Sequence, residues 1–380
     1  MILAGEQPLA GIRQEVFMHR ICKLTAIALS VGALSLSTAA QQYKVTGLVA
    51  DQSGVAPATD LNLVNPWGLS RSSGSPWWVS DNGTGLATLY DGTGAAKSLV
   101  VTVQTGDPSV SSTGTPTGTV FNGGTGFVLA NGKPALFMFV TEDGTISAWN
   151  SGTSATIEVN TKSASVFKGA ALANLPMPNG SSSTFLYVAD FRKGRVQVYD
   201  SSFQHVSLFD EPFRDESLPR GYAPFNIQNI GGELYVTFAR QDDQKHDEVD
   251  GPGRGYVDVF SPFGRLLRRF EHGWWLNGPW GLALASGDFG IYSHDLLVGQ
   301  FGTGNVAVYD PITGRFIDLL RDANNAPLAI DGLWGISFGS GSVTGSGPAT
   351  TLYFSAGSDG EQHGLFGTIT PIQNTLGNSQ

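Results

Sequence analysis

Short apolar runs recur along the whole chain at an almost constant spacing. One of these runs has a position that holds tryptophan in three copies, and we call it the tryptophan position. Its six copies are centred on Trp67, Thr117, Ala170, Phe225, Trp280 and Trp334. Successive copies are 50, 53, 55, 55 and 54 residues apart. A fixed period of this size predicts a repeat architecture, in which each unit buries its apolar faces against its neighbours.

Each repeat contains further β-rich runs, separated by Gly, Asp, Asn and Pro. The second run is apolar, as in residues 77–80, and the third alternates and ends in an aromatic and a turn residue, as at Tyr90 and Asp91. A fourth run follows the turn, as in residues 315–319. Such runs are strand and hairpin signals, and no segment of the repeats has helical periodicity. The sequence therefore predicts an all-β fold, a six-bladed β-propeller with four-stranded blades.

The last repeat has only three strands and ends near residues 366–370, while one β-rich run, residues 43–49, precedes the first repeat. An unpaired strand at a sheet edge would invite aggregation. We therefore expect residues 43–49 to close the ring as the outer strand of the last blade. The result is a single domain, residues 43–371, with a short tail at residues 372–380.

The segment before the propeller has the pattern of an export signal. In residues 18–40 a positively charged start precedes an apolar stretch too short to span a bilayer, and residues 38–40 form a small-residue cleavage site. Met18 is then the expected start and residues 1–17 a mis-assigned extension; the alternative is a buried N-terminal helix. Because Cys22, the single cysteine, lies inside the signal, the mature chain has no thiol. We expect export to the periplasm or the extracellular space, with no membrane span after signal removal.

Composition narrows the choice of partners. The formal net charge of −10 and the lack of a basic stripe argue against a nucleic-acid partner. Charged residues make up 14% of the chain, below the ~25% of typical soluble domains, so Ser, Thr and Asn must solvate the sheets. The 50 glycines agree with a fold that has many tight turns.

Polar residues gather on one predicted face of the ring. Because the strands of a blade alternate in direction, first strands begin and second strands end on the same face, around the central channel. The candidate metal ligands at these ends are Asp81, Glu142, Asp190, Asn277 and Asp331. Their carboxylate and amide oxygens suit calcium, although the sequence establishes no cofactor. Two alternatives stay open: turns favour Asp and Asn at such places, or Lys168 and Arg240 neutralise the acids.

Further residues of this face are candidates for ligand binding. They stand at strand ends and in three loops, and they are Asn65, Lys168, Arg240, His246, His272, Trp274, Trp275, Gln300 and His363. The histidines could act as acid or base, and the two adjacent tryptophans could stack on a ligand or simply pack. The long insertion in the fourth repeat, residues 241–254, is rich in acids. Its acids lack the spacing of a calcium loop, and such a charge run is typical of a solvated loop.

One catalytic motif matches by its letters, the G-I-S-F-G of residues 335–339. This nucleophile motif needs a turn from a strand into a helix to expose its serine. Here it lies in the first strand of a repeat, where the equivalent copy reads Gly68-Leu69-Ser70. We therefore do not assign Ser337 as a nucleophile.

Three phrases carry a resemblance to a known family. They are N-P-W-G-L, V-S-D-N-G-T-G with a following L-Y-D, and N-G-P-W-G-L-A with a following G-x-V-A-V-Y-D. They resemble an uncharacterised family of secreted bacterial six-bladed, NHL-like propellers, some of which end in a PEP-CTERM sorting tail. The resemblance covers residues 43–371 and implies the fold and export, but no activity. Residues 375–380 do not form a sorting tail. A more distant likeness runs to NHL-repeat, gluconolactonase-like and streptogramin-lyase-like propellers, from which no catalytic residue is transferred.

Three functions compete. The first is a non-catalytic binding module for a small molecule, a glycan or a protein, because no complete catalytic constellation is present. The second is a calcium-dependent hydrolase or lyase that acts on a small ester, lactone or sugar derivative, because acids, amides and histidines converge on one face. The third, a dehydrogenase with a quinone cofactor, has no specific support in the sequence. Metal content of chelator-free protein separates the first two.

Overall fold

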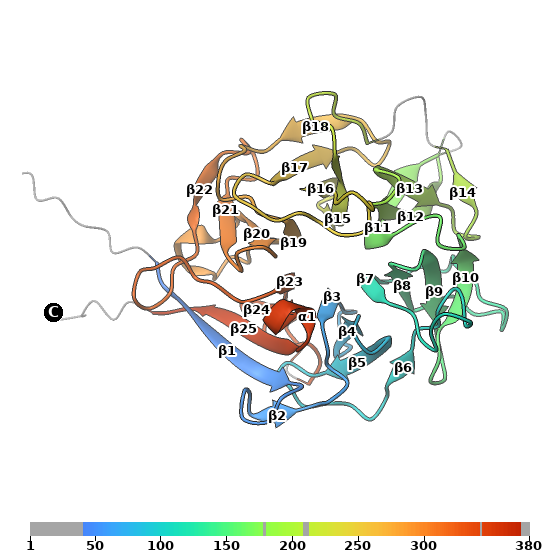
Figure 1. The fold of residues 1–380 in the computed structure, drawn as a ribbon, viewed down its shortest axis with the longest axis horizontal. Helices are drawn as coiled ribbons and strands as arrows, with labels where there is room; N and C mark the ends of the chain where they lie inside the picture. The colour runs from blue at the N-terminus through green and yellow to red at the C-terminus, as the bar shows by residue number, and fades with distance from the viewer. Residues whose placement is uncertain (1–40, 178–179, 208–212, 343, 374–380) are drawn as a thin grey trace, which may run out of the picture. The chain divides into compact units, whose positions relative to one another are not determined.

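The strands form six sheets arranged in a ring around a central axis (Figure 1). The structure is a computed structural model, and it describes residues 41–177, 180–207, 213–342 and 344–373. Five sheets have four strands and one has five. The prediction of an all-β, six-bladed propeller is therefore confirmed.

The predictions about the two ends of the chain concern mainly residues outside the described ranges. The export signal at 18–40, the extension at 1–17 and most of the tail at 372–380 lie outside the described residues. In the part of the chain that the structure describes, no helix is both long enough and apolar enough to cross a membrane.

Within each of the first five blades, the strands follow one another outward from the axis in chain order. The first blade contains β3 (Pro66–Ser70), β4 (Trp77–Asp81), β5 (Leu86–Tyr90) and β6 (Val101–Thr102). The second contains β7 (Pro116–Phe121), β8 (Phe137–Thr141), β9 (Thr145–Trp149) and β10 (Thr156–Asn160). The third contains β11 (Phe167–Pro176), β12 (Ser182–Asp190), β13 (Arg195–Tyr199) and β14 (His205–Val206).

The remaining blades follow the same plan. The fourth contains β15 (Tyr222–Ile230), β16 (Glu233–Arg240), β17 (Gly255–Phe260) and β18 (Leu266–Arg269). The fifth contains β19 (Pro279–Leu284), β20 (Leu296–Gln300), β21 (Val306–Tyr309) and β22 (Phe316–Leu319), with a 3-10 turn, η1 (Gly290–Tyr292). The sixth contains β23 (Leu333–Phe338), β24 (Leu352–Ala356) and β25 (Leu365–Pro371), with a short turn, α1 (Ser358–Glu361).

The N-terminal strand closes the ring, as predicted. Strand β1 (Tyr43–Ala50) pairs antiparallel with β25, from Tyr43 opposite Pro371 to Ala50 opposite Leu365. The short strand β2 (Ala58–Thr59) adds to β1 in parallel and makes this the five-stranded sheet. The Tyr43 side chain is buried, and its hydroxyl donates a hydrogen bond of 2.9 Å to the carbonyl oxygen of Phe289 in the fifth blade. Strand β1 thus also ties two blades together.

The strand register corrects the alignment of the third repeat. In the first blade Pro66 is opposite Asp81 and Leu69 is opposite Val79, with a bulge between the two pairs. In the third blade the matching pairs are Phe167 with Asp190 and Ala170 with Val188. Ala170 therefore corresponds to Leu69, and the tryptophan position is occupied by Lys168. The alignment of the third repeat from the sequence was displaced by two residues, because this repeat has a lysine at the tryptophan position.

The residues at the tryptophan position meet at the axis of the ring. Trp67, Phe225, Trp280 and Trp334 belong to one buried cluster, which we call the axial cluster. The indole rings of Trp67 and Trp334 stack with their centroids 3.4 Å apart, and Trp280 meets both edge-on. These tryptophans are core residues that pack on one another across the axis as well as between neighbouring blades.

Candidate functional site

Charged side chains gather at the end of the channel where the first strands begin. We call this end the acidic mouth and define it by Glu142, Lys168, Asp247, Glu248 and Glu361. They come from the second, third, fourth and sixth blades. The predicted topology, with first-strand starts and second-strand ends on one face, is seen in pairs such as Pro66 with Asp81.

Lys168 is the central cation of the acidic mouth. Its side chain is fully buried, and its Nζ donates to Glu142 Oε1 at 2.5 Å and to Asp247 Oδ1 at 3.2 Å. Burial alone would lower the pKa of Lys168, but the carboxylates of Glu142, Glu248 and Asp247 raise it above its ordinary value. Lys168 therefore keeps its positive charge inside the fold.

Glu142 reaches the mouth because it stands one residue beyond a strand end. In the second blade the residue equivalent to Asp81 is Thr141, which pairs with Pro116 as Asp81 pairs with Pro66. Successive side chains of a strand point to opposite sides, so Glu142 points away from the blade interior. Its Oε2 accepts a hydrogen bond of 2.8 Å from Asn82 Nδ2. The second carboxylate oxygen is thus held by an amide of the first blade.

The insertion of the fourth blade folds over the mouth. Gln241 and Glu248 form an antiparallel bridge, and the Asp242 amide donates to the carbonyl of Asp247 at 2.8 Å. Its tip, residues 243–245, is exposed, as expected for a solvated loop, but Asp247 reaches Lys168. The prediction of a solvated loop therefore holds for the tip only.

His246 and Asp247 interact directly within this insertion. His246 Nδ1 lies 2.8 Å from Asp247 Oδ1, and each side chain shifts the pKa of the other. The hydrogen bond from His246 holds the pKa of Asp247 well below its usual range, with a smaller contribution from Lys168. The same bond raises the pKa of His246, against the effect of burial. At neutral pH Asp247 is therefore an ionised carboxylate that already has two donors.

Glu361 approaches the mouth from the sixth blade on an unusual backbone. Its φ is 69°, and Asp359 and Gly360 are also left-handed, so α1 is a tight turn rather than a regular helix. Glu361 Oε2 accepts a hydrogen bond of 3.0 Å from Asn65 Nδ2, and Asn65 Oδ1 accepts one of 3.1 Å from Trp334 Nε1. The turn and the axial cluster together set the position of this carboxylate.

Two carboxyl groups of the mouth retain protons near neutral pH. Burial, reinforced by Glu142, raises the pKa of Glu361 to about 7. Burial, with a contribution from Asp250, raises the pKa of Glu248 to about 8, although Lys168 acts in the opposite direction. Burial is thus the main reason for the raised pKa values of these two carboxyl groups, and neighbouring acids add to it.

Among the residues that the structure describes, one set of side chains could hold a metal ion. Glu142, His246 and Asp247 each offer one ligand atom, and these atoms lie within 4.8 Å of one another. Calcium prefers oxygen ligands only, whereas a set with one imidazole and two carboxylates also suits manganese or zinc. The Lys168 ammonium already contacts the two carboxylates, so a metal ion must share them with it.

The other predicted metal ligands lie outside this set. Asp81 and Asp190 are fully buried inside their own blades. Asp81 Oδ2 accepts a hydrogen bond of 3.1 Å from the Thr88 amide, and Asp190 accepts one from the Gln197 side chain. Their positions at the strand end itself, one residue before the equivalent of Glu142, explain why their carboxylates face inward.

Asn277 and Asp331 stabilise loops of the same face. Asn277 Oδ1 accepts a hydrogen bond of 2.6 Å from the Gly251 backbone amide. The backbone amide of Asn277 donates to Gln300 Oε1 at 2.8 Å. Asp331 is exposed, and its Oδ2 accepts a hydrogen bond of 2.8 Å from the Asp359 amide. Of the five candidate metal ligands, Glu142 alone belongs to the set around Lys168.

Of the two adjacent tryptophan candidates, Trp275 is packed and Trp274 is exposed. The Trp275 ring stacks on Phe316 with centroids 4.0 Å apart, and its Nε1 donates to the Tyr309 hydroxyl at 2.6 Å. Trp274 is 65% exposed. Of the two, Trp274 is the one available to stack on a ligand.

The two remaining histidine candidates contact residues outside the acidic mouth, and Arg240 is exposed. The His272 ring stacks on Tyr256 with centroids 4.3 Å apart. His363 Nδ1 lies 2.8 Å from Asp51 Oδ2. Arg240 is exposed at the end of β16, so the cation that lies among the acids is Lys168.

Sequence reasoning missed three residues of the mouth. Asp247, Glu248 and Glu361 lie in loops or tight turns, and no periodic pattern marks such residues when they turn toward the axis. The acids of residues 241–254 and 359–361 were visible, but turn preference and solvation explained them equally well. The register of the third blade, which places a lysine among aromatic residues, became known only from the strand pairing.

Comparison with known proteins identifies relatives by sequence and similar folds by structure. No family model matches the chain. It is 31% identical over 349 residues to "Uncharacterized protein L690" of Acanthamoeba polyphaga mimivirus, covering 87% of this chain and 86% of that protein. It is 30% identical over 349 residues to "Uncharacterized protein R648" of the same virus, covering 87% and 81%.

Solved structures resemble the chain at lower sequence identity. A structural genomics protein of unknown function from Bacteroides thetaiotaomicron has a TM-score of 0.52 at 13% identity, over 87% of this chain and 76% of that one. A virginiamycin B lyase from Staphylococcus aureus has a TM-score of 0.46 at 13% identity, over 87% of this chain and all of that one. At these identities the likeness concerns the fold alone.

Proposed function

This chain belongs to the same family as the two mimivirus proteins, and from its geometry we propose that it is an exported binding propeller that takes a small cation at the acidic mouth. A divalent metal ion is the simplest such ligand. The observation that carries the proposal is the arrangement of Glu142, Asp247, Glu248 and Glu361 around the buried cation of Lys168.

The charge balance of the mouth supports cation binding. The raised pKa values of Glu248 and Glu361 reflect carboxyl groups whose ionisation is opposed by burial and by neighbouring acids. A divalent cation would favour the ionised forms and release their protons. Glu142 and Asp247 would supply carboxylate oxygens and His246 a nitrogen, while Glu361 would interact with the bound cation through its charge. Calcium and manganese are therefore the two ions to test.

Titration calorimetry of chelator-treated protein tests the proposal. We expect calcium or manganese to bind with 1:1 stoichiometry. Repeating the titration in two buffers of different ionisation enthalpy should show protons released on binding, because Glu361 must ionise. Glu361→Gln should release fewer protons, while Glu158→Gln, on the outer strand β10, should behave as wild type. The absence of binding heat for both metals would refute the proposed ligand, and unchanged proton release in Glu361→Gln would refute its placement.

Export is part of the proposal and rests on residues 18–40. The positive start, the apolar stretch and the small-residue site at 38–40 support cleavage after Ala40. Mass spectrometry of secreted material from an expressing bacterial cell tests this directly. A mature N-terminus near residue 41 is expected, and a mature chain that retains residues 18–36 would contradict it.

A second candidate function is metal-dependent hydrolysis or lyase chemistry on a small ester, lactone or sugar derivative. One observation favours it: the pKa of Glu361 is raised to about 7, where a carboxyl group can donate and accept protons. Turnover of a lactone panel with the metal that binds, and its loss in Glu361→Gln, would support this function over simple binding. A protein that binds metal without turning over any of these substrates is the binding module of the first proposal.

A further inference from the structure

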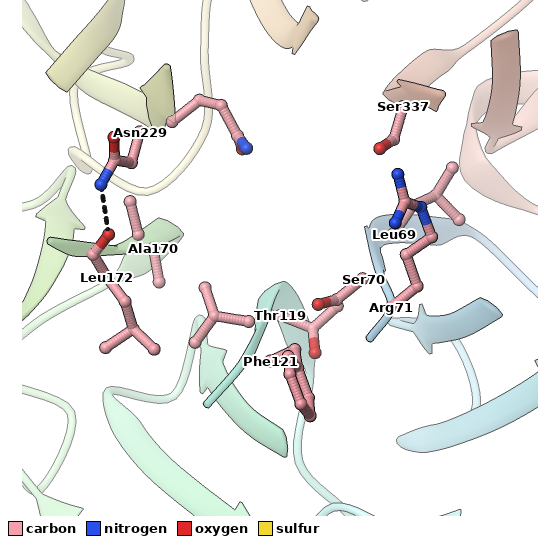
Figure 2. Close-up of a pocket in the computed structure, with 12 residues that line it drawn as sticks. Leu69, Ser70, Arg71, Thr119, Phe121, Ala170, Leu172, Asn229 and Ser337 are labelled. Carbon is pink, nitrogen blue, oxygen red and sulfur yellow. Dashed lines mark hydrogen bonds between the residues drawn. The ribbon is translucent and has the colours of Figure 1, made fainter. Parts of the chain in front are cut away.

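The opposite end of the channel contains a cavity with a different chemistry. The first strands end there, and residues of the first, second, third, fourth and sixth blades enclose a space of about 310 Å³ (Figure 2). Arg71 and Ser337 lie on one side of it, Leu172 and Asn229 on the other, and Thr119 lies between them. A volume of this size is at the lower end of the range for small-molecule sites.

The cavity is separate from the acidic mouth. A second, narrower space of about 30 Å³ continues from it toward the axis, where Trp280 of the axial cluster lines it. Trp67, at the start of β3, and Arg71, just after its end, are four residues apart, or about 13 Å along an extended strand. The axial cluster therefore lies between the cavity and the charged groups around Lys168.

Arg71 brings a cation to a cavity that contains no acid. The described residues lining the cavity include neither Asp nor Glu, and no carboxylate among the described residues pairs with Arg71. Its Nε donates to the Phe338 carbonyl at 2.8 Å and its Nη2 to the Gly339 carbonyl at 3.1 Å. These bonds hold the guanidinium in place and leave Nη1 available. A half-buried guanidinium without a carboxylate partner favours an anionic ligand.

Thr119 provides a second, independent indication. Its side chain is only 8% exposed, and its Oγ1 has no hydrogen-bond partner among the described residues. Thr119 lines both the cavity and the narrower space behind it. A buried hydroxyl without a partner is unfavourable by itself, and a ligand in the cavity would supply the partner.

The lining of the cavity is mixed, and more of its exposed surface is polar than apolar. Leu69, Phe121 and Leu172 contribute apolar surface, whereas Ser70 and Ser337 contribute hydroxyl groups. We propose that this cavity binds a small organic carboxylate, its carboxylate held by Arg71 and Thr119. This site is independent of the cation site of the proposed function.

Ligand-detected NMR and calorimetry test the site with defined probes. The probes are benzoate, cyclohexanecarboxylate and hexanoate, each beside its uncharged amide. At least one carboxylate should bind at least ten-fold more tightly than its amide. Failure of all three carboxylates to bind, or equal binding of the amides, would overturn the proposal.

Variants separate binding from folding. Thr119→Val keeps the shape of the side chain, so it should weaken carboxylate binding about ten-fold, the effect of one charge-assisted hydrogen bond, without lowering the melting temperature. Arg71→Gln should abolish binding, with some loss of stability because its two carbonyl contacts are lost. Glu361→Gln, at the acidic mouth, should leave carboxylate binding unchanged. Wild-type affinity in Thr119→Val, or weakened binding in Glu361→Gln, would place the ligand elsewhere.

Discussion

The ammonium nitrogen of Lys168 lies over the indole ring of Trp67, 4.9 Å from the ring centroid. Both residues occupy the tryptophan position of their blades, so the repeat itself brings the cation and the aromatic face together. An ammonium over an indole face is stabilised by the ring quadrupole, more strongly when it is desolvated. The third blade thus uses a core position of the repeat to place a charge on the axis.

Removing the Lys168 charge should destabilise the fold strongly. Lys168→Met leaves Glu142 almost buried and without its cation, which costs about 3 to 5 kcal/mol for a broken buried pair. The double variant Lys168→Met with Glu142→Gln should recover much of this loss. Lys97→Met breaks the pair with Asp91, in which the lysine side chain is 37% exposed, and should change the unfolding free energy by only about 1 kcal/mol. Urea denaturation measures all three, and equal effects of the two lysine variants would contradict the role of Lys168.

Stability should fall as the pH rises from about 5 to 9. Glu361 and Glu248 have pKa values of about 7 and 8 in the folded chain, above the ordinary value of 4.5. In this window the folded state binds more protons than the unfolded state, so their contribution is fully present below pH 4.5 and is lost as the pH rises through 7 and 8. His246, whose pKa is also raised, changes stability in the same direction.

Thermal melts across this pH range check the prediction. The double variant Glu248→Gln with Glu361→Gln should show a flatter decline of the melting temperature than wild type. Glu158→Gln serves as the control and should keep the wild-type slope. A melting temperature that rises steadily from pH 5 to pH 9 in wild type would show that these two carboxyl groups do not titrate as described.

Ring closure should depend on the buried Tyr43 of β1. Tyr43 is 1% exposed, packs on Phe289 with ring centroids 4.8 Å apart and donates a hydrogen bond to its carbonyl. Tyr43→Ala should therefore destabilise by about 3 to 5 kcal/mol, as large-to-small substitutions of buried aromatic residues do. Val45 is 36% exposed on the same strand, so Val45→Ala is the matched control and should have a much smaller effect. Similar denaturation midpoints for the two variants would argue against the described pairing.

The close packing of first strands from neighbouring blades should make Gly68 sensitive to substitution. A Cβ added at Gly68 would lie 2.5 Å from the Thr117 carbonyl oxygen in the next blade. Gly68→Ala should therefore force neighbouring blades apart and destabilise by about 1 to 3 kcal/mol or more. A Cβ at Gly74, in the same blade, meets nothing within 4 Å, so Gly74→Ala should be nearly neutral. Chemical denaturation of both variants decides the matter, and a neutral Gly68→Ala would show that the blades are farther apart than described.

The fold was accessible from the sequence because its information is local and repeated. Each blade is a meander of consecutive strands, so the period and the turn residues were enough to predict six blades and the closing strand. The site was accessible only in part, because it depends on single-residue offsets. Glu142 faces the mouth while Asp81 and Asp190 face inward, and a shift of one residue along a strand reverses the direction of a side chain.

The register of Lys168 and the course of the fourth-blade insertion were beyond the sequence for a related reason. A lysine at the tryptophan position matches no repeat consensus, and only strand pairing identifies its place. Likewise, the contact between Asp247 and Lys168 joins residues of different blades. Such contacts follow from the closed ring, not from any local pattern.

The pairing of β1 with β25 has a consequence for how the chain folds during synthesis. Tyr43 and Pro371 are opposite each other although 328 residues separate them, from 43 to 371. The ribosome makes β1 before the first-blade strand β3 and makes β25 last of all, so β1 must wait without this partner while the five complete blades emerge. Contacts between such distant parts of the chain form slowly. The nascent protein therefore exposes a strand edge until its synthesis is nearly complete, and a chaperone that shields residues 43–50 during this interval would raise the yield of folded protein.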